Sequence, residues 1–328
     1  MSTMTTPPEA LIRRLRQGKR FLLTSHINPD GDAVGSSLAL ARVLRSMGKG
    51  AVVWLRDPFP TVYAPLPGAS RIRHGMEAPE GYPDKFDTVI PLECPSLDRS
   101  GLQEILGDHP NLLNIDHHLG NQLYGAINWV DPGAPSVGEL VQRLAETLNV
   151  PLDADTANLL YLTLVTDTGG FRFSNATAIA FSAAAKLVEA GARPELISQW
   201  LYESLPAAHI QLLGAMLQTL ELHSEGRIAT ASLTPQMYLD AGAKDGDAEG
   251  LIDTPRSIAG VEAVALFKVR DDNTVKASLR SQGKIDVEAI ARHYGGGGHH
   301  NAAGCAVNLD LATAQQEIVA ALAEQMGT

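Results

Sequence analysis

RFLLTSHINPDGDAVGSSLALARVLRSMG, residues 20–48, contains the signals that decide the fold of the first half of the chain. The apolar run at its start predicts a short buried strand, and the apolar stripe in its second half predicts a helix. Between these two elements lie His26, Asp30 and Asp32. A connection between a strand and a helix does not need this many polar groups for its own sake, so the stretch predicts a ligand at this point.

Strand and helix signals alternate along the first part of the chain. We expect strands at residues 20–25, 51–55, 86–93 and 111–116. We expect helices at residues 9–17, 32–48, 136–148, 153–166 and 176–190. This alternation predicts an α/β fold with a parallel sheet flanked by helices, and such sheets bind ligands at the carboxyl ends of their strands.

The pattern changes in the last third of the chain. Strand-like segments are predicted at residues 227–233, 261–270 and 274–280, and helices at residues 286–294 and 311–326. The glycine-rich segment GGGGHHNAAG, residues 295–304, lies between these two helices and is followed at once by a strand-like segment, so it belongs to a folded domain. We therefore expect a first domain over residues 1–195, a helical linker over 196–224 that continues a helix to about residue 222, and a smaller α+β domain over 225–328.

Composition limits the range of functions. A chain of 328 residues is long enough for two domains. The net charge of −11 argues against a broad surface for nucleic acid, and the 5% aromatic content argues against a stacking track for long single strands. The two cysteines, Cys94 and Cys305, make no disulfide framework, and no signal peptide or membrane span is evident. We expect a cytoplasmic protein with no membrane partner.

Acidic and histidine residues recur at the ends of the predicted elements. Besides the first cluster, they are Glu93, Asp116, His117, His118 and Asp167. Imidazole and carboxylate ligands without thiolates suit Mn²⁺ or Mg²⁺, with Zn²⁺ and Fe²⁺ as alternatives. Each piece alone also fits a structural role as a turn, a helix cap or a surface loop. Because clustered carboxylates repel one another unless cations neutralise them, the convergence of all the pieces favours a metal site for phosphoryl chemistry.

Five motifs carry a specific resemblance. HINPDGDAVGSSLAL, VIPLECPSLDRSG, NIDHH, LVTDTGGFRFSN and GGGGHHNAAGC resemble the successive motifs of the DHH/DHHA1 phosphoesterase superfamily. Within it, the chain is most similar to the NrnA-type nanoRNases and pAp phosphatases, from about residue 20 to the C-terminus. The resemblance implies an N-terminal DHH catalytic domain, a C-terminal DHHA1 substrate-binding domain and two Mn²⁺-type ions, with Mg²⁺ or another divalent metal as the alternative.

The resemblance also implies roles for individual residues. The resemblance implies that His26 and Asp30 bind the first metal and that Asp32, His117 and Asp167 bind the second. Glu93 would bridge the two metals. His118 would contact the substrate phosphate, and Asp116 would orient its neighbours. The implied substrate-binding residues are Ser278, Arg280, Gly296, Gly297, Gly298 and His299, with Ser136 and Arg172 as weaker candidates for which capping or packing is the alternative.

Glu93 departs from the pattern, because the family normally has aspartate at this position. Glutamate is one methylene longer and could bridge two ions, hold only one, or bind through water. Pro91 is also unusual within a predicted strand, since it removes a donor from the ladder. We expect two-metal binding to be retained.

These features together predict an Mn²⁺-dependent phosphodiesterase and phosphatase. It would degrade short oligoribonucleotides, and short DNA oligonucleotides, to mononucleotides and dephosphorylate 3′-phosphoadenosine 5′-phosphate (pAp). The alternative within the same class is a phosphodiesterase for cyclic di-AMP or linear dinucleotides. The alternative of another class is a non-catalytic nucleotide-binding regulator with a decayed metal site. The sequence leaves the oligomeric state open, including a homodimer.

Overall fold

A computed structural model describes residues 5–203, 205–270, 274–283 and 285–327. The chain forms two compact units, Met1–Ser204 and Leu205–Thr328. None of the described helices is both long and apolar enough to span a bilayer.

The first unit is built around parallel strands. Its strands are β1 (Arg20–Thr24), β2 (Gly50–Leu55), β3 (Arg73–His74), β4 (Thr88–Pro91), β5 (Leu113–Asp116) and β6 (Ile127–Val130). Its helices are α1 (Glu9–Gln17), α2 (Gly31–Ser46), α3 (Gln103–Leu106), α4 (Val137–Leu148), α5 (Ala154–Asp167), α6 (Ala178–Glu189) and α7 (Pro194–Tyr202). Short 3₁₀ turns lie at Thr61–Tyr63, Ala69–Arg71 and Leu97–Ser100.

The order of these strands creates a binding position. Strands β3-β2-β1-β4 form one parallel sheet and β5-β6 a parallel pair, while single parallel bridges connect β4 to β5. The spatial order is therefore β3-β2-β1-β4-β5-β6, which reverses direction between β1 and β4. In open parallel sheets, ligands bind at such a reversal, outside the carboxyl ends of the strands. The predicted parallel α/β fold is confirmed.

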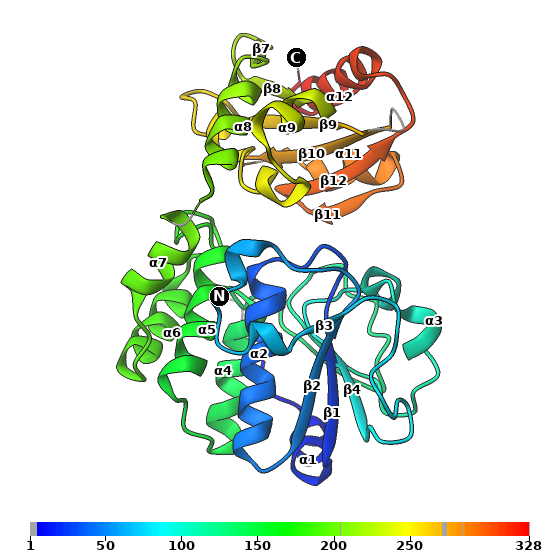
Figure 1. The fold of residues 1–328 in the computed structure, drawn as a ribbon, viewed down its shortest axis with the longest axis vertical. Helices are drawn as coiled ribbons and strands as arrows, with labels where there is room; N and C mark the ends of the chain where they lie inside the picture. The colour runs from blue at the N-terminus through cyan, green and yellow to red at the C-terminus, as the bar shows by residue number, and fades with distance from the viewer. Residues whose placement is uncertain (1–4, 204, 271–273, 284, 328) are drawn as a thin grey trace. The chain divides into compact units, whose positions relative to one another are not determined.

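Apolar side chains cover both faces of this sheet. Phe21 and Leu23 of β1 join the core that contains α2, α4 and α5, whereas Leu22 joins a smaller core with Trp54 and Leu106 on the other face. This division follows from the alternation of side chains along a strand. Figure 1 shows α2, α4 and α5 to one side of the strands and α3 to the other.

Helix α2 lies in the centre of the unit, and most of its residues are buried. It packs closely against α5, because a Cβ atom at Gly35 would lie 2.6 Å from Cγ2 of Thr163. The Asp30 side chain caps its N-terminus by accepting the Ala33 N–H at 3.0 Å. These contacts fix the start of α2 beside the carboxyl end of β1.

The fold departs from the sequence-based prediction in several details of this unit. The strand predicted at residues 86–93 is shorter, because Glu93 has a φ of 52°, which ends the extended conformation. Strand β6 was not predicted, since a four-residue segment carries too short a pattern to recognise.

The second unit contains a mixed six-stranded sheet. Its strands are β7 (Glu221–His223), β8 (Ile228–Leu233), β9 (Ala263–Val269), β10 (Val275–Ser281), β11 (Gly297–His299) and β12 (Ala302–Val307). Its helices are α8 (Ala207–Leu217), α9 (Pro235–Ala241), α10 (Asp253–Arg256), α11 (Val287–His293) and α12 (Leu311–Gln325), with a 3₁₀ turn at Asp245–Ala248. The strand order is β11-β12-β10-β9-β8-β7, and the β8-β9 pair is parallel while the other pairs are antiparallel.

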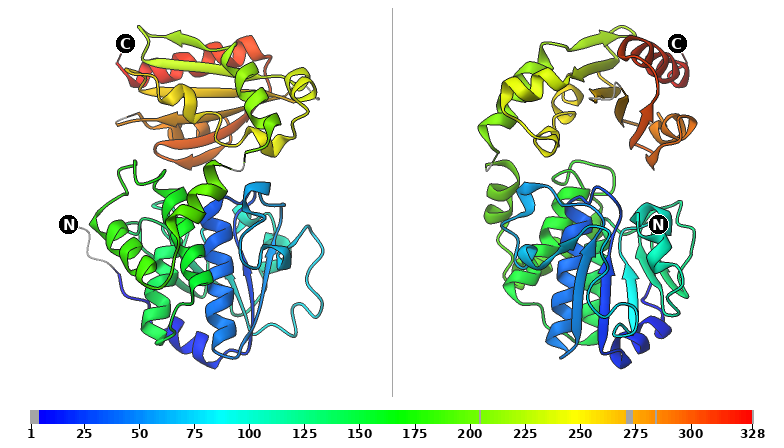
Figure 2. Two further views of the ribbon diagram at one scale, coloured as in Figure 1. Left: turned by 60° about the vertical axis from the view of Figure 1, so that its left-hand side comes forward. Right: turned by 45° about the vertical axis from the view of Figure 1, so that its right-hand side comes forward.

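Helices cover both faces of this second sheet. Alternate residues of β9 pack either with α11 and α12 or with α8, α9 and α10. Figure 2 shows α12 and the α8–α10 segment on opposite faces. The helix predicted to continue to about residue 222 ends at Leu217, and its last predicted residues form β7 instead.

Candidate active site

The polar residues singled out in the first unit come together at the carboxyl end of its sheet. His26 follows β1, Glu93 follows β4, and His117 and His118 follow β5. Asp30 and Asp32 lie at the start of α2, and Asp167 is the last residue of α5. Because β1 and β4 flank the point where the strand order reverses, the fold directs side chains from five elements into one place.

Glu93 lies at the middle of this group. Its Oε2 is 2.7 Å from Nε2 of His26, and its Oε1 is 3.6 Å from Nε2 of His117 and 3.7 Å from Nε2 of His118. The side chain is 2% exposed. The two oxygens of one carboxylate therefore face histidines from two different strands.

Among the residues that the structure describes, three sets of ligand atoms each converge within 4.8 Å. They are His26, Asp30 and Glu93; Asp32, His117 and Asp167; and Glu93, His117 and His118. Since Glu93 and His117 belong to two sets each, the three sets form one continuous cluster. All the predicted metal ligands belong to it. His118, predicted as a substrate contact, lies in the same cluster.

The three histidines are held in one tautomer by their Nδ1 atoms. Nδ1 of His26 donates to the Ile27 carbonyl at 2.7 Å, and Nδ1 of His117 donates to the Ala134 carbonyl at 3.1 Å. Nδ1 of His118 donates to Asp116 Oδ1 at 2.7 Å. With Nδ1 protonated, Nε2 of a neutral imidazole carries the lone pair that a metal needs, and here Nε2 faces the cluster in each case.

Asp32 also holds two helices together. Its carboxylate accepts the backbone N–H groups of Val137 at 2.6 Å and Gly138 at 3.0 Å, at the N-terminus of α4. The positive end of a helix favours a negative charge at this position. Burial nevertheless raises the pKa of Asp32 well above its usual value, and the charges of Glu93 and Asp167 add to the effect.

The proton distribution shows a cluster that needs positive charge. Burial lowers the pKa of His26, but the Glu93 carboxylate outweighs it and raises that pKa to about 10. Burial raises the pKa of Asp167 to about 7, with a further contribution from Glu93. In the absence of a cation, protons therefore neutralise the buried carboxylates. The imidazole and carboxylate donors fit Mn²⁺, Mg²⁺ or a similar divalent ion, which would take over this role.

Comparison with known proteins identifies the family. Residues 20–164 match the DHH family, N-terminal domain, and residues 226–328 match the DHHA1 domain. The chain is 32% identical over 308 residues to the bifunctional oligoribonuclease and PAP phosphatase NrnA of Thermus thermophilus, which covers 93% of this chain and 89% of the relative. The chain belongs to the DHH family of phosphoesterases. As a DHH phosphoesterase, the protein is an enzyme.

This DHH chain is also similar to two further proteins. It is 25% identical over 337 residues to the cyclic-di-AMP phosphodiesterase PdeA of Listeria monocytogenes, covering 96% of this chain and 49% of that protein. The crystal structure of an exopolyphosphatase-related protein from Bacteroides fragilis matches with a TM-score of 0.90 and 26% identity over 98% of each chain. This chain therefore has the fold of the Bacteroides fragilis protein over nearly its whole length.

Two weaker predicted site residues of the DHH unit differ in their surroundings. Ser136 is fully buried, accepts the Glu139 N–H at 3.1 Å and lies 3.1 Å from the Thr163 hydroxyl. It therefore caps the N-terminus of α4, which was the alternative to a role in the site. Arg172 is exposed in the loop after Asp167, and its Nε donates to the Gly169 carbonyl at 2.5 Å.

The predicted residues of the DHHA1 unit lie on neighbouring strands. Ser278 and Arg280 are half-buried on β10, and their partners on β12 pair in turn with Gly297 and His299 of β11. The His299 side chain lies outside the described part of the chain. A Cβ atom at Gly296 would lie 2.1 Å from the Gly304 carbonyl oxygen, and one at Gly298 would lie 2.4 Å from that of Ala302. The close approach of β12 thus accounts for these two glycines, whereas Gly297 faces open space.

Two amides support the DHH cluster and were not predicted. Asn175 donates from Nδ2 to Asp167 Oδ2 at 3.2 Å and to the carbonyls of Pro135 and Asp167, each at 3.1 Å. Asn121 donates to Asp116 Oδ2 at 2.6 Å. Asn175 stands in the motif LVTDTGGFRFSN, but an amide gives no charge or metal-ligand signal, and nothing in the local pattern distinguishes Asn121.

Proposed function

We propose that the protein hydrolyses short oligoribonucleotides to mononucleotides and removes the 3′-phosphate of pAp, with divalent cations as cofactors. The observation that carries the proposal is the cluster at Glu93, where ligands from several elements converge at the reversal of the sheet. Similarity to the NrnA protein of Thermus thermophilus supports this choice of substrates.

We assign the cofactor as two Mn²⁺ ions. One would be held by His26, Asp30 and Glu93, and the other by Asp32, His117 and Asp167, with Glu93 reaching toward both. Bound cations would polarise the phosphate and lower the pKa of a water molecule. The distances from the two Glu93 oxygens to histidines of both sets support a bridging position for its carboxylate.

The remaining residues of the site would bind and orient the substrate. Asp116 fixes the His118 ring, so that Nε2 is available to donate to a phosphate oxygen when the ring is protonated. Arg280, Ser278, the open backbone at Gly297 and the imidazole of His299 would provide contacts to the nucleotide in the DHHA1 unit. Arg172 would add a charged contact beside Asp167.

The product pattern from end-labelled RNA tests this proposal. With Mn²⁺, oligonucleotides of about two to ten nucleotides should give mononucleotides, and pAp should release inorganic phosphate. Both reactions are hydrolyses of phosphate esters, which a two-cation site promotes. Cleavage would stop after chelation and return on adding the metal. If no short oligonucleotide is cleaved and pAp stays intact with Mn²⁺, the proposed activity is wrong.

A pair of histidine variants tests the assigned role of His118. His118→Gln should lower turnover by about 10²-fold, the usual loss for a donor to a charged transition state, while Mn²⁺ still binds. His74→Gln is the matched control, since His74 is exposed on β3 and lies outside the cluster. Equal turnover in the two variants would remove His118 from the reaction.

A second candidate activity is hydrolysis of cyclic di-AMP. Similarity to PdeA over 96% of this chain favours it. Turnover of cyclic di-AMP, linear pGpG, pAp and a five-nucleotide RNA under the same conditions separates the candidates. A preference for cyclic di-AMP would replace our first choice, whereas a preference for linear substrates would support it.

The proposal also covers the domain bounds, the location and the oligomeric state of the protein. The catalytic and substrate-binding domains are proposed to span residues 1–195 and 225–328, joined by the segment 196–224. The protein is proposed to act in the cytoplasm. Light scattering of the full-length chain tests whether it forms a homodimer.

A further inference from the structure

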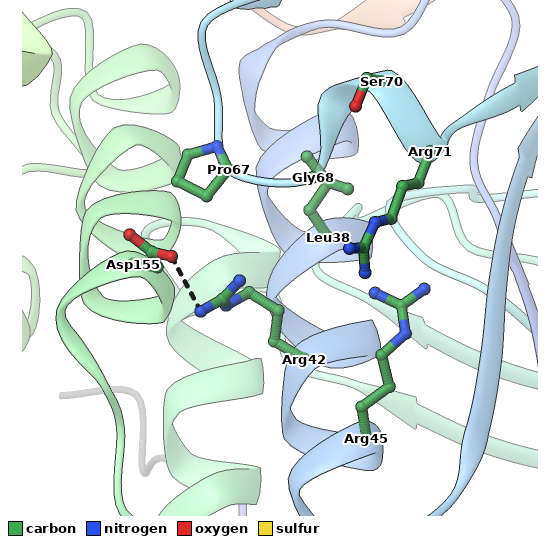
Figure 3. Close-up of a pocket in the computed structure, with 8 residues that line it drawn as sticks. All are labelled: Leu38, Arg42, Arg45, Pro67, Gly68, Ser70, Arg71 and Asp155. Atoms are coloured by element: carbon green, nitrogen blue, oxygen red, sulfur yellow. Dashed lines mark ion pairs between the residues drawn. The ribbon is translucent and has the colours of Figure 1, made fainter.

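A polar cavity lies in the first unit, away from the cluster at Glu93. Its volume is about 240 Å³, and its lining is Leu38, Arg42, Arg45, Pro67, Gly68, Ser70, Arg71 and Asp155 (Figure 3). The cavity residues of α2 lie toward its C-terminal end, whereas Asp32 lies in its first turn. At about 1.5 Å per residue, Asp32 and Arg45 are about 20 Å apart along the helix. The cavity shares no residue with the candidate metal ligands.

The charges in this cavity are unbalanced. Arg42 is paired with Asp153 at 2.7 Å and Asp155 at 3.0 Å. Within the described ranges, no carboxylate lies within ion-pair distance of Arg45 or Arg71. Figure 3 shows the guanidinium groups of Arg45 and Arg71 directed toward each other. Two like charges thus face one another in a chain whose net charge is −11.

Structural roles explain two of the three arginines. Arg42 connects α2 to α5 through Asp153 and through Thr156, whose hydroxyl accepts from its Nε at 3.1 Å. Arg45 connects α2 to β2 by donating to the Ala51 carbonyl at 2.7 Å. The Arg71 guanidinium has no such contact among the residues that the structure describes. Arg71 is exposed, so solvent screens part of its repulsion with Arg45, and an anion between the two guanidinium groups would offset the rest.

We propose that this cavity binds a phosphate group, either as inorganic phosphate or as the phosphate of a nucleoside monophosphate. The planar guanidinium fork matches phosphate oxygens and donates two hydrogen bonds at once, and the Ser70 hydroxyl on the rim adds a further donor. The volume lies below the range of about 300–1,000 Å³ that encloses drug-sized ligands, so a small anion fits better than a whole dinucleotide.

The surroundings of Arg45 agree with this interpretation. Burial lowers the pKa of Arg45, and the nearby charges of Arg71 and Arg42 lower it further. A phosphate dianion in the cavity would attract the positive charges of all three arginines and would therefore raise the pKa of Arg45 again. The cavity differs in this respect from the cluster at Glu93, where carboxylates would repel a free anion in the absence of a cation.

Titration of the full-length protein with inorganic phosphate, AMP and adenosine tests the proposal. Arg71→Gln should weaken binding by about tenfold or more, as expected for the loss of a charged hydrogen-bonding group. Arg73→Gln is the matched control, because Arg73 is an exposed arginine of β3 that does not line the cavity. Adenosine lacks the phosphate and should not bind here. Tighter binding of inorganic phosphate or of AMP identifies the source of the group.

Two outcomes would overturn the proposal. One is a wild-type protein whose binding of both anions is unaffected by Arg71→Gln. The other is an equal loss of affinity in Arg71→Gln and Arg73→Gln, which would reflect general electrostatic attraction. Melting curves without ligand check that both variants fold. Any anion binding at the metal cluster would be the same in both variants, because neither substitution lies in that cluster.

Discussion

Nε2 of His26 lies 2.7 Å from Oε2 of Glu93, and this contact joins the carboxyl ends of β1 and β4. The side chains of both residues are buried. The extra methylene of Glu93, compared with the aspartate usual in the family, together with the φ of 52°, carries the carboxylate to this position. This contact therefore explains how the longer Glu93 side chain is accommodated in the cluster.

Shortening Glu93 should weaken metal binding. Glu93→Asp withdraws the carboxylate by one methylene and should lose contact with at least one histidine set, and Glu93→Gln removes the charge. We expect Mn²⁺ affinity to fall by about tenfold or more in each variant, the loss seen when support of a metal site is removed. Isothermal titration measures the affinity, and elemental analysis counts the ions. An affinity in Glu93→Asp equal to or above that of the wild type would contradict the bridging role.

The proton distribution predicts a pH-dependent effect of the metal on stability. His26 has an ordinary pKa of 6.5 that Glu93 raises to about 10 against the effect of burial. Its contribution to the stability of the metal-free protein is therefore complete below 6.5 and is lost as the pH rises through about 10. Burial raises the pKa of Asp167 from 3.8 to about 7, so this carboxyl also destabilises the metal-free protein increasingly as the pH rises from 3.8 to about 7.

Melting temperatures with and without Mn²⁺ check this prediction. The increase in Tm on adding Mn²⁺ should be larger at about pH 8.5 than at about pH 6, because the metal competes with fewer protons and the metal-free state is less stable. Titration in weak buffer should also release protons as the metal binds. An equal or smaller increase in Tm at the higher pH would contradict the assigned protonation states.

The sequence predicts the local elements well and the supporting contacts poorly. Residues 20–48 predict β1 and α2 with ends within two residues of those observed, because a buried strand and a buried helix have strong periodic patterns. All the ligands of the cluster are recognisable, since charged groups at strand ends stand out. The bonds from the start of α4 to Asp32 join segments more than 100 residues apart, and no local pattern encodes them. The conformation of Glu93 is set by the same long-range packing.

Asn175 should act on the metal site through Asp167. Asn175→Ala removes the amide that donates to Asp167 Oδ2 at 3.2 Å, which leaves that carboxylate free to turn. We expect Mn²⁺ affinity to fall by about 10–100-fold, the range typical of residues that orient a metal ligand. Ser174→Ala, in the same loop at an exposed position, is the control. A drop in turnover at saturating Mn²⁺ with unchanged metal affinity would show that Asn175 acts on the substrate instead.

Asp87 should stabilise the first unit above its pKa. Its Oδ2 accepts the backbone N–H groups of Arg20 at 2.7 Å and Lys19 at 2.6 Å, and these bonds lower the pKa of the carboxyl. The contribution is present above the unfolded value and is lost as the pH falls through the folded value. Asp87→Asn should cost about 1 kcal/mol near pH 7, because the site is exposed and the neutral amide accepts more weakly. Urea unfolding at about pH 7 and about pH 3 measures this difference, which should be smaller at the lower pH. Asp84→Asn, which changes an exposed acid outside this contact, should have no effect at either pH. A difference of the same size at both values would mean that the charge of Asp87 plays no part.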